Sequence, residues 1–323
     1  MNPFFIVGPT ATGKSEIAAE IASQLNAEIV NADAFQIYRG LDRLTAKPDE
    51  ATLARAPHHL LSAVPLSEEM NVEKFRSAAV EAIRDIQARG RPVLIAGGSG
   101  LYVRALTHGL SQLPGADPKL RAQLSALSLD ELRQQLIELD PEAARSIDLK
   151  NRRRVARAVE ICLLTGQPVS QQRLQVAAAD AVRARPASAT PATAVRPRAT
   201  STATTGSFIS RERAELYERI DRRVEKMFAG GVVEEVRALP EIGSTAEKAL
   251  GLREIRSLLA GEISEAECIA KIQQATRRYA KRQLTWFRRQ DIFAPLNLSS
   301  HGCSQAIELI AQNARRAFAQ KDD

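Results

Sequence analysis

The sequence predicts an α/β fold in which helices flank a mostly parallel sheet. Short apolar runs at Phe4–Val7, Glu28–Asn31 and Val93–Ala96 predict three strands. Helical patterns at Glu16–Leu25 and Val72–Arg89 alternate with them. This order is typical of βαβ units, whose ligand sites lie at the carboxyl ends of the strands. Because a P-loop pattern also follows the first strand, we expect a P-loop NTPase-like parallel sheet.

That pattern consists of a glycine, four free positions, and then glycine, lysine and a hydroxyl residue. Backbone N–H groups of such a loop, together with the positive end of the following helix, bind a di- or triphosphate. We expect Lys14 to reach the terminal phosphates and the Ser15 hydroxyl to hold a magnesium ion. An ordinary glycine-rich turn is the alternative. The expected diphosphate-binding residues are Gly8, Pro9, Thr10, Ala11, Thr12, Gly13, Lys14 and Ser15.

Helical patterns dominate the rest of the chain. Apolar residues recur at helical spacing in Leu120–Leu127, Leu129–Leu139 and Arg152–Leu164, which predicts an inserted helical subdomain. Helical periodicity resumes at Glu212 and continues to the C-terminus, with a break near Pro295. We therefore expect a helical C-terminal part as well.

A low-complexity segment separates these two helical parts. It consists almost wholly of Ala, Arg, Pro, Thr and Ser, with no acidic residue between Asp180 and Glu212. Because this composition buries too little apolar surface to offset the entropy of ordering, we expect a flexible basic loop. It can serve as a plain linker or contact a nucleic acid. The expected division is a core over 1–115 and 208–323, an inserted helical subdomain over 116–175 and the basic loop over 176–207.

Composition limits the class of protein. The 323 residues are 44% hydrophobic, enough for a core, and no apolar run approaches the length of a membrane span. Because the first strand begins at Phe4, we expect no signal peptide. Cys162, Cys268 and Cys303 are isolated, so we expect packing thiols in a reducing cytoplasm. The net charge of +7 is concentrated in a few segments and favours a polyanionic partner.

Two strand ends carry candidate chemistry. Asp33 closes the second strand, so its carboxylate is expected to face the bound phosphates. It can ligate magnesium, accept a proton, or simply cap a turn. The third strand ends in Gly97–Gly100 without an aspartate, which argues against an ATPase or GTPase. This turn either lets a ligand approach, with the Ser99 hydroxyl as a donor, or is only a turn.

Two segments are rich in arginine. Asn151–Arg157 places Arg153 and Arg157 on one helix face, where they bind an anion or are simply solvated. Thr276–Arg289 carries six basic residues, no acid and the pair Trp286-Phe287. A basic helix with aromatic residues suits a phosphate backbone, although such an aromatic pair is more typical of a core.

Two further pairs are less specific. Arg219 and Arg223 lie four residues apart on a predicted helix, where they can clamp a departing pyrophosphate or form a charged face. His58 and His59 have no acid or cysteine nearby in the sequence, so we expect a turn and no metal site.

With these residues in view, the chain resembles the bacterial tRNA dimethylallyltransferases. The resemblance spans nearly the whole chain except the basic loop, and its motifs occur in the same order. The matching segments are Gly8–Ser15, Asp33, Gln36–Gly40, Thr45–Pro48, Pro57–Leu60, Gly97–Tyr102, Arg157–Glu160, Leu250–Glu254 and Thr276–Arg288.

The resemblance implies a reaction and its residues. The P-loop would hold the pyrophosphate of dimethylallyl diphosphate while N6 of an adenosine beside the tRNA anticodon attacks the allylic carbon. Asp33 looks like the base for that amine, and Thr10, Lys14, Ser15 and Arg223 look like the groups that hold diphosphate and Mg²⁺. The implied catalytic set is Lys14, Asp33, Ser99 and Arg223. The implied tRNA-binding residues are Asp33, Ala34, Phe35, Gln36, Ser99, Arg121, Arg153, Arg154, Val155, Ala156, Arg157, Lys248, Ala249, Leu250, Gly251, Leu252 and Arg253.

The chain departs from the family pattern at four positions. Ala34 and Phe35 replace Ser and Arg, Ser99 replaces Thr, and Leu44 stands where Gly is common. We expect a monomer that binds the tRNA anticodon stem-loop and no membrane. A small-molecule or nucleotide kinase, a prenyltransferase acting on free adenine nucleotides, and a non-catalytic RNA-binding protein are the alternatives. The basic helices argue against the first two, and the intact P-loop with its neighbouring acid argues against the third.

Overall fold

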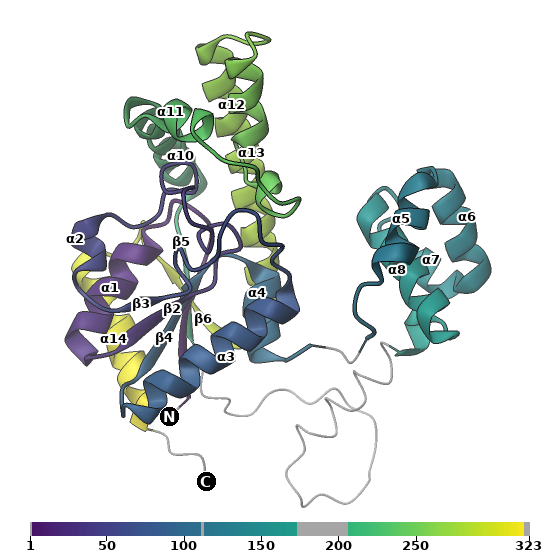
Figure 1. The fold of residues 1–323 in the computed structure, drawn as a ribbon. Helices are drawn as coiled ribbons and strands as arrows, with labels where there is room; N and C mark the ends of the chain where they lie inside the picture. Colours follow the sequence, from purple (N-terminus) through teal and green to yellow (C-terminus); the bar gives the residue numbers. More distant parts are fainter. Residues whose placement is uncertain (1, 111–112, 173–205, 320–323) are drawn as a thin grey trace, which may run out of the picture. The chain divides into compact units, whose positions relative to one another are not determined.

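The computed structural model describes residues 2–110, 113–172 and 206–319, and the chain forms two compact units (Figure 1). Unit 1 consists of Met1–Gly109 and Ala199–Asp323, and unit 2 of Leu110–Arg198. The boundary therefore falls before the expected start of the subdomain at residue 116. Of the expected basic loop over 176–207, all but the last two residues lie outside the described residues, and those two belong to a strand.

Unit 1 contains a six-stranded sheet whose strands pair in parallel, in the order β3-β2-β4-β1-β5-β6. This parallel sheet confirms the predicted fold class. The first strand lies centrally, because Val7 pairs with Gly97 of β4 on one side and with Phe208 of β5 on the other. The strands are β1 (Phe4–Val7), β2 (Glu28–Asn31), β3 (His58–His59), β4 (Val93–Gly97), β5 (Gly206–Ser210) and β6 (Phe293–Asn297).

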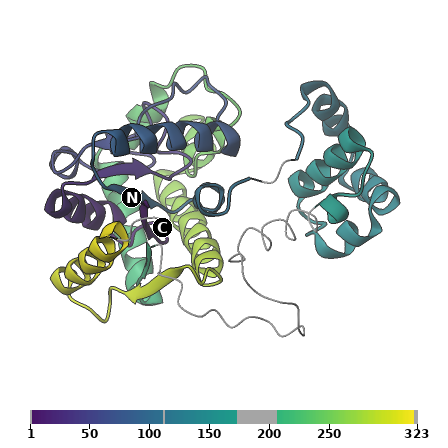
Figure 2. The same ribbon diagram turned by 90° about the horizontal axis from the view of Figure 1, so that it is seen from below.

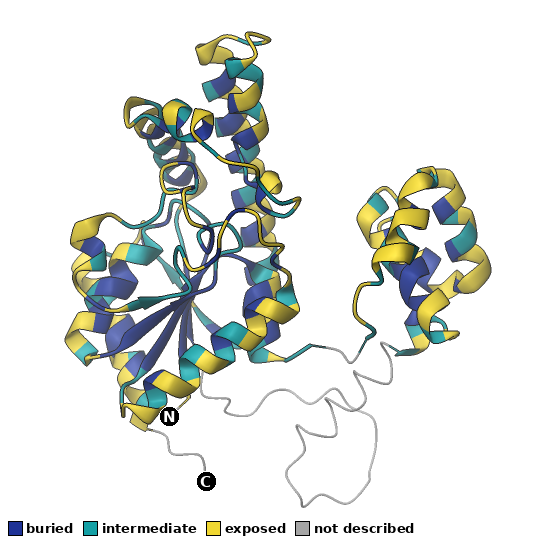
Figure 3. Cartoon of the chain, in the orientation of Figure 1, coloured by how far each residue is buried: buried dark blue, intermediate teal, exposed yellow. Residues whose placement is uncertain are grey.

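Helices cover both faces of this sheet, and α3 and α14 lie on opposite sides of it (Figure 2). Phe4 and Ile6 pack with α1 and α14, whereas Phe5 and Val7 pack with α3 and α4, because successive strand residues point to opposite faces. Both faces are therefore buried, which explains the continuous apolar strands (Figure 3). These helices are α1 (Lys14–Leu25), α2 (Glu50–Leu53), α3 (Val72–Ala88), α4 (Gly100–Thr107) and α14 (Cys303–Ala319).

A second group of helices in unit 1 extends beyond the carboxyl edge of the sheet (Figure 1). Its longest member, α13, is anchored in the core by Phe287, which is fully buried and stacks on Phe208. Trp286 also packs against this core, so the core interpretation of the aromatic pair is correct. The group consists of α10 (Arg213–Ala229), α11 (Val232–Arg237), η1 (Ala246–Lys248), α12 (Leu252–Leu259) and α13 (Glu265–Phe287).

Unit 2 is a small helical bundle with its own core. Leu132, Leu136, Val155 and Val159 are fully buried and form its centre. Side chains cap the helix starts, as the sequence leads one to expect of Asp, Ser and Asn at these positions. The helices are α5 (Pro118–Ala126), α6 (Leu129–Leu139), α7 (Pro141–Ser146) and α8 (Arg152–Thr165).

The structure corrects three expectations. β5 begins at the expected end of the basic loop, and β6 lies at the expected break near Pro295, so both are strands that the sequence analysis did not predict. Pro295 is accommodated because β6 is an edge strand. The segment His58–His59 is a short strand instead of a turn. Cys303 is exposed, so it is no packing thiol, unlike the buried Cys162 and Cys268. In the described part of the chain, no helix is both long and apolar enough to cross a membrane.

Candidate functional site

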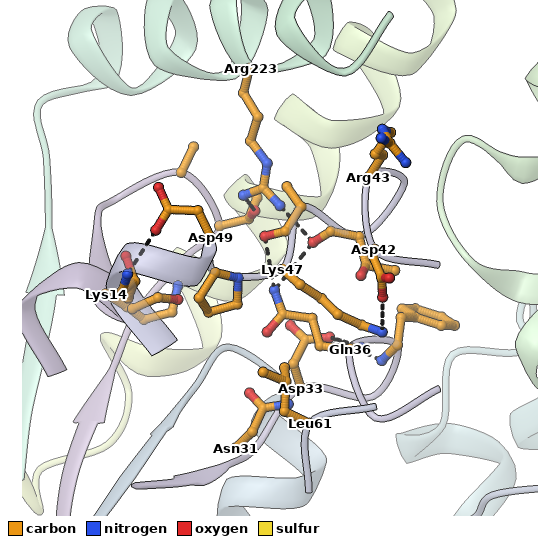
Figure 4. Close-up of a pocket in the computed structure, with 18 of the residues that line it drawn as sticks. Lys14, Asn31, Asp33, Gln36, Asp42, Arg43, Lys47, Asp49, Leu61 and Arg223 are labelled. Carbon is orange, nitrogen blue, oxygen red and sulfur yellow. Dashed lines mark hydrogen bonds and ion pairs between the residues drawn. The ribbon is translucent and has the colours of Figure 1, made fainter. Parts of the chain in front are cut away.

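A pocket of about 1110 Å³ opens in unit 1 at the carboxyl ends of β1 and β2. Lys14 and Ser15 of α1, Asp33 after β2 and Arg223 of α10 line it, together with Gln283 of α13. Figure 4 shows Arg223 reaching into this space from the helix above, while Lys14 and Asp33 border it from other sides. The pocket lies where parallel α/β sheets place their ligands.

The P-loop lies between β1 and α1, in the strand–loop–helix context that its sequence predicts. Gly8 is required by close packing, because a Cβ there would lie 2.2 Å from the carbonyl oxygen of Ile209 in β5. Gly13 adopts a left-handed conformation with φ of 95° directly before the helix. Inside the loop, the Thr12 hydroxyl donates to the Pro9 carbonyl at 2.9 Å. The N-terminus of α1 therefore opens directly onto the pocket.

Three arginines brace the loop from outside. Nε of Arg211 donates to the Thr12 carbonyl at 3.0 Å, and Nε of Arg219 donates to the Ala11 carbonyl at 2.8 Å. Nη1 of Arg223 donates to the Thr10 hydroxyl at 2.8 Å. The spacing of Arg219 and Arg223 indicated such a pair. Arg211 was missed because it directly follows β5, a strand that the sequence analysis did not predict.

Gln283 joins two loops of the pocket. Its Oε1 accepts from the Thr10 backbone N–H at 2.9 Å, and its Nε2 donates to the Gly98 carbonyl at 2.8 Å. The side chain is buried and both ends of the amide are satisfied. Sequence reasoning missed this residue as well. The available signal was an uncharged polar residue on the core-facing side of the basic segment.

Two cations with lowered pKa values, Lys14 and Arg223, line the pocket. Burial lowers the pKa of Lys14 to about 8, nearby Asp33 opposes this change, and Arg223 reinforces it. Burial also lowers the pKa of Arg223, again opposed by Asp33. Both cations are held by neutral acceptors, since Lys14 donates to the Pro9 carbonyl and Arg223 to a hydroxyl and a carbonyl. Their charges are therefore available to an anionic ligand.

Asp33 caps a turn and also lines the pocket. Its Oδ1 accepts from the backbone N–H groups of Phe35 at 3.0 Å and Gln36 at 3.4 Å, as a turn-capping aspartate does. The residue also lines the pocket. The adjacent Ala34 N–H donates to the Ser99 hydroxyl at 2.9 Å, so Ser99 supports the Asp33 turn. The carboxylate is thus held in place next to the two cations.

The donors in the pocket fit a magnesium ion. The Ser15 hydroxyl and the Asp33 carboxylate both line it, and oxygen atoms are the ligands that Mg²⁺ prefers. Among the described residues no cluster of three or more His, Cys, Asp or Glu side chains could hold a metal by itself. An ion here would therefore complete its coordination with substrate oxygens and water, as is usual for Mg²⁺ at phosphate sites.

The histidine pair has an acidic partner after all. Nε2 of His59 lies 2.6 Å from Oε2 of Glu28 on the neighbouring strand, and Glu28 also pairs with Arg89 and Arg91. The sequence distance between the two strands concealed this contact. With two arginines on one buried carboxylate, the cluster is an ion-pair network.

The implied tRNA-binding residues of unit 1 fall into three groups. Asp33, Phe35, Gln36 and Leu250 line the pocket, and Ala34 and Ser99 lie beside it. Lys248 and Arg253 are exposed. Ala249, Gly251 and Leu252 are buried, so their side chains offer no surface to an RNA.

In unit 2, the implied tRNA-binding residues differ in burial and in their ion pairs. Arg153 and Arg154 are exposed on α8, whereas Val155 is fully buried and Ala156 is partly buried. Arg121 and Arg157 both pair with Glu160, which is only 1% exposed, through N–O distances of 2.9 and 2.6 Å. One carboxylate is thus shared by two arginines, which leaves the three side chains with one net positive charge.

The basic segment on α13 is less free than its sequence indicates. Nε of Arg277 donates to Oδ1 of Asp221 on α10 at 3.0 Å, so this arginine is paired. Arg278, Lys281 and Arg282 are exposed. These three residues form a positive strip on unit 1 that suits a phosphate backbone.

The chain is similar to several known proteins. The sequence model of the family described as IPP transferase matches residues 36–290. The tRNA dimethylallyltransferase 1 of Citrifermentans bemidjiense is 42% identical over 288 residues, which cover 88% of each chain. The tRNA dimethylallyltransferase of Akkermansia muciniphila is 40% identical over 303 residues, covering 94% of this chain and 96% of its own.

Solved structures are also similar. The tRNA isopentenylpyrophosphate transferase of Bacillus halodurans aligns with a TM-score of 0.65 at 30% identity, over 98% of each chain. A eukaryotic dimethylallyltransferase solved acting on tRNA aligns with a TM-score of 0.70 at 21% identity, over 100% of this chain and 87% of its own, a likeness of fold alone. By the family match and these identities, this chain belongs to the IPP transferase family.

Proposed function

We propose that this protein transfers the dimethylallyl group of dimethylallyl diphosphate to N6 of the adenosine beside the tRNA anticodon. The observation that carries the proposal is the shared pocket of Lys14, Arg223 and Asp33, in which two cations and one carboxylate face the same space. Relatives at about 40% identity are named tRNA dimethylallyltransferases.

The reaction needs one bond made and one broken. N6 attacks the allylic carbon, the bond from that carbon to oxygen breaks, and the electron pair leaves on diphosphate. Lys14 and Arg223 stabilise the charge that builds on the leaving group, because their positions are fixed before the reaction. The proton lost from N6 passes to Asp33, whose carboxylate is oriented by two backbone N–H groups.

Magnesium belongs to the proposal as a partner of the diphosphate. Ser15 is the residue that would hold it, and the ion would supply charge stabilisation to the leaving group. The P-loop amides and Lys14 provide the remaining contacts to phosphate oxygens.

The acceptor is proposed to be an RNA anticodon stem-loop because exposed cations lie on both units. Arg278, Lys281 and Arg282 are exposed on unit 1, and Arg153 and Arg154 on unit 2. A target base must leave its stack to reach a pocket of this kind. We expect the protein to act as a monomer in the cytoplasm.

Incubation with labelled dimethylallyl diphosphate, Mg²⁺ and unmodified tRNA tests the proposal. Label is expected in tRNA at the adenosine beside the anticodon. A parallel reaction with ATP and small acceptors tests the kinase alternative, and the Asp33→Ala variant serves as the control. Phosphate transfer from ATP without label in tRNA would replace the prenyl-transfer proposal with a kinase.

A further inference from the structure

A glutamate on α11 holds one wall of the pocket. Oε1 of Glu235 accepts from the Arg43 backbone N–H and Oε2 accepts from the Leu44 backbone N–H, both at 2.8 Å. The carboxylate therefore binds two successive amides of the segment Arg43–Lys47, all of whose residues line the pocket. Charge-assisted bonds of this type are about twice as strong as neutral ones.

The segment held in this way presents an acceptor to Arg223. The Thr45 carbonyl accepts from Nη2 of Arg223 at 2.8 Å and also from Nε2 of Gln36 at 3.2 Å. Nη1 of the same guanidinium donates to the Thr10 hydroxyl in the P-loop at 2.8 Å. Arg223 is thus aligned between the P-loop and the segment, as its two dashed contacts in Figure 4 illustrate.

The anchoring of Thr45 depends on contacts beyond its own turn. The bonds from the Thr45 N–H to the Leu41 carbonyl and from the Lys47 N–H to the Asp42 carbonyl shape the turn itself. Glu235, in contrast, ties the turn to α11. Fixing an arginine side chain costs considerable rotamer freedom, so Arg223 needs both of its hydrogen bonds to stay in place. If the Thr45 carbonyl moved away, Arg223 would lose one of the two.

We propose that Glu235 is a positioning residue for Arg223. By fixing the backbone of Arg43 and Leu44, it sets the Thr45 carbonyl and so the guanidinium that meets the diphosphate. The inference rests on the proposed function where it assigns diphosphate to Arg223. Binding of inorganic pyrophosphate, however, tests it without any transfer of a prenyl group.

The adjacent Glu234 provides a matched control. It has the same charge on the same helix, but it is exposed, and its ion-pair partner among the described residues is Arg237, at 3.7 Å. Surface pairs of this kind contribute little. Calorimetric titration of Mg²⁺ and inorganic pyrophosphate should therefore give the same affinity for Glu234→Ala as for the parent chain.

The Glu235→Ala variant should weaken pyrophosphate binding about 10-fold, the scale of one lost charge-assisted bond. Glu235→Gln keeps the shape and one acceptor oxygen, so its affinity should lie between the two. In tRNA prenylation, kcat/KM for dimethylallyl diphosphate should fall while KM for tRNA stays unchanged. Thermal unfolding of each variant shows whether the fold is kept.

A double-mutant cycle decides the matter. In an Arg223→Ala background the Glu235→Ala change should no longer weaken pyrophosphate binding, because no guanidinium remains to be positioned. An equal loss in both backgrounds would overturn the proposal, and so would unchanged affinity in a folded Glu235→Ala protein. If the cycle holds but the parent chain transfers no label to tRNA, the proposed function fails and the positioning role stands.

Discussion

Arg223 of unit 1 and the pair Arg121 and Arg157 of unit 2 are held in opposite ways. In unit 1, Arg223 donates to a hydroxyl and a carbonyl, so its charge stays available to a ligand. In unit 2, Arg121 and Arg157 share the buried carboxylate of Glu160. Neutral acceptors orient a cation without cancelling its charge, whereas a carboxylate does both. Arginine content alone therefore does not locate an anion site, and the partner of each arginine must be known.

Removing the Asp33 carboxylate should have the largest effect on the rate of transfer. Asp33→Ala is expected to slow single-turnover transfer to tRNA by roughly 10²–10⁴, the range for a general base. Pyrophosphate affinity should fall little, because the cations remain. Transfer at the parent rate in rapid-quench experiments would remove Asp33 from its proposed role.

Removing the buried Glu160 carboxylate of unit 2 should lower the stability of that unit. Burial alone would raise the pKa of Glu160, but its bonds from Arg121 and Arg157 bring that pKa below its ordinary value. Because both arginines are partly exposed, we expect Glu160→Gln to destabilise unit 2 by about 1–3 kcal/mol, less than a fully buried pair would lose. Hydrogen exchange should speed up in α5 and α8 and stay unchanged in α1.

The contacts of Glu160 with Arg121 and Arg157 also predict how the stability changes with pH. A carboxyl whose pKa is lowered on folding contributes stability above its unfolded pKa and loses it as the pH falls through the folded value. The difference in stability between the parent chain and Glu160→Gln should thus shrink below about pH 4. A difference that stays constant down to pH 2 would show that the charge of Glu160 contributes nothing.

A smaller effect concerns protons at Lys14. With its pKa lowered to about 8 by burial, Lys14 is mostly neutral at pH 9. The negative charge of bound diphosphate favours the protonated amine, so binding at pH 9 should take up a proton, and binding at pH 7 should take up almost none. Calorimetry in two buffers of different ionisation enthalpy measures this uptake. Lys14→Met should abolish it, and an uptake equal at both pH values would contradict the assignment.

Elements of the fold could be predicted from the sequence where the interactions that form them are local. The P-loop was predictable because strand, glycines and helix start are consecutive, and α5, α6 and α8 of unit 2 because their apolar spacing is local. β5 and β6 were not, since their pairing partners lie far away in the sequence and Pro295 is allowed only at a sheet edge.

The sequence analysis missed three residues at the pocket for the same reason. Arg211, Glu235 and Gln283 each bond to a segment more than a hundred residues away, so no local pattern marks them. Asp33 and Lys14, which line the pocket, could be proposed from the sequence because strand ends and the P-loop place them by topology. The buried positions of Val155 and Leu252 within implied contact segments required the packing of the fold to be known.

The most direct test of the contrast between the units is a titration of Mg²⁺ and inorganic pyrophosphate into three proteins. These are the parent chain, Arg223→Met and Arg121→Met, each checked for folding by thermal unfolding. We predict that Arg223→Met weakens binding at least about 10-fold, since it removes a charge held for the ligand, and that Arg121→Met leaves the affinity unchanged. Equal losses in both variants, or an unchanged affinity in Arg223→Met, would contradict the account.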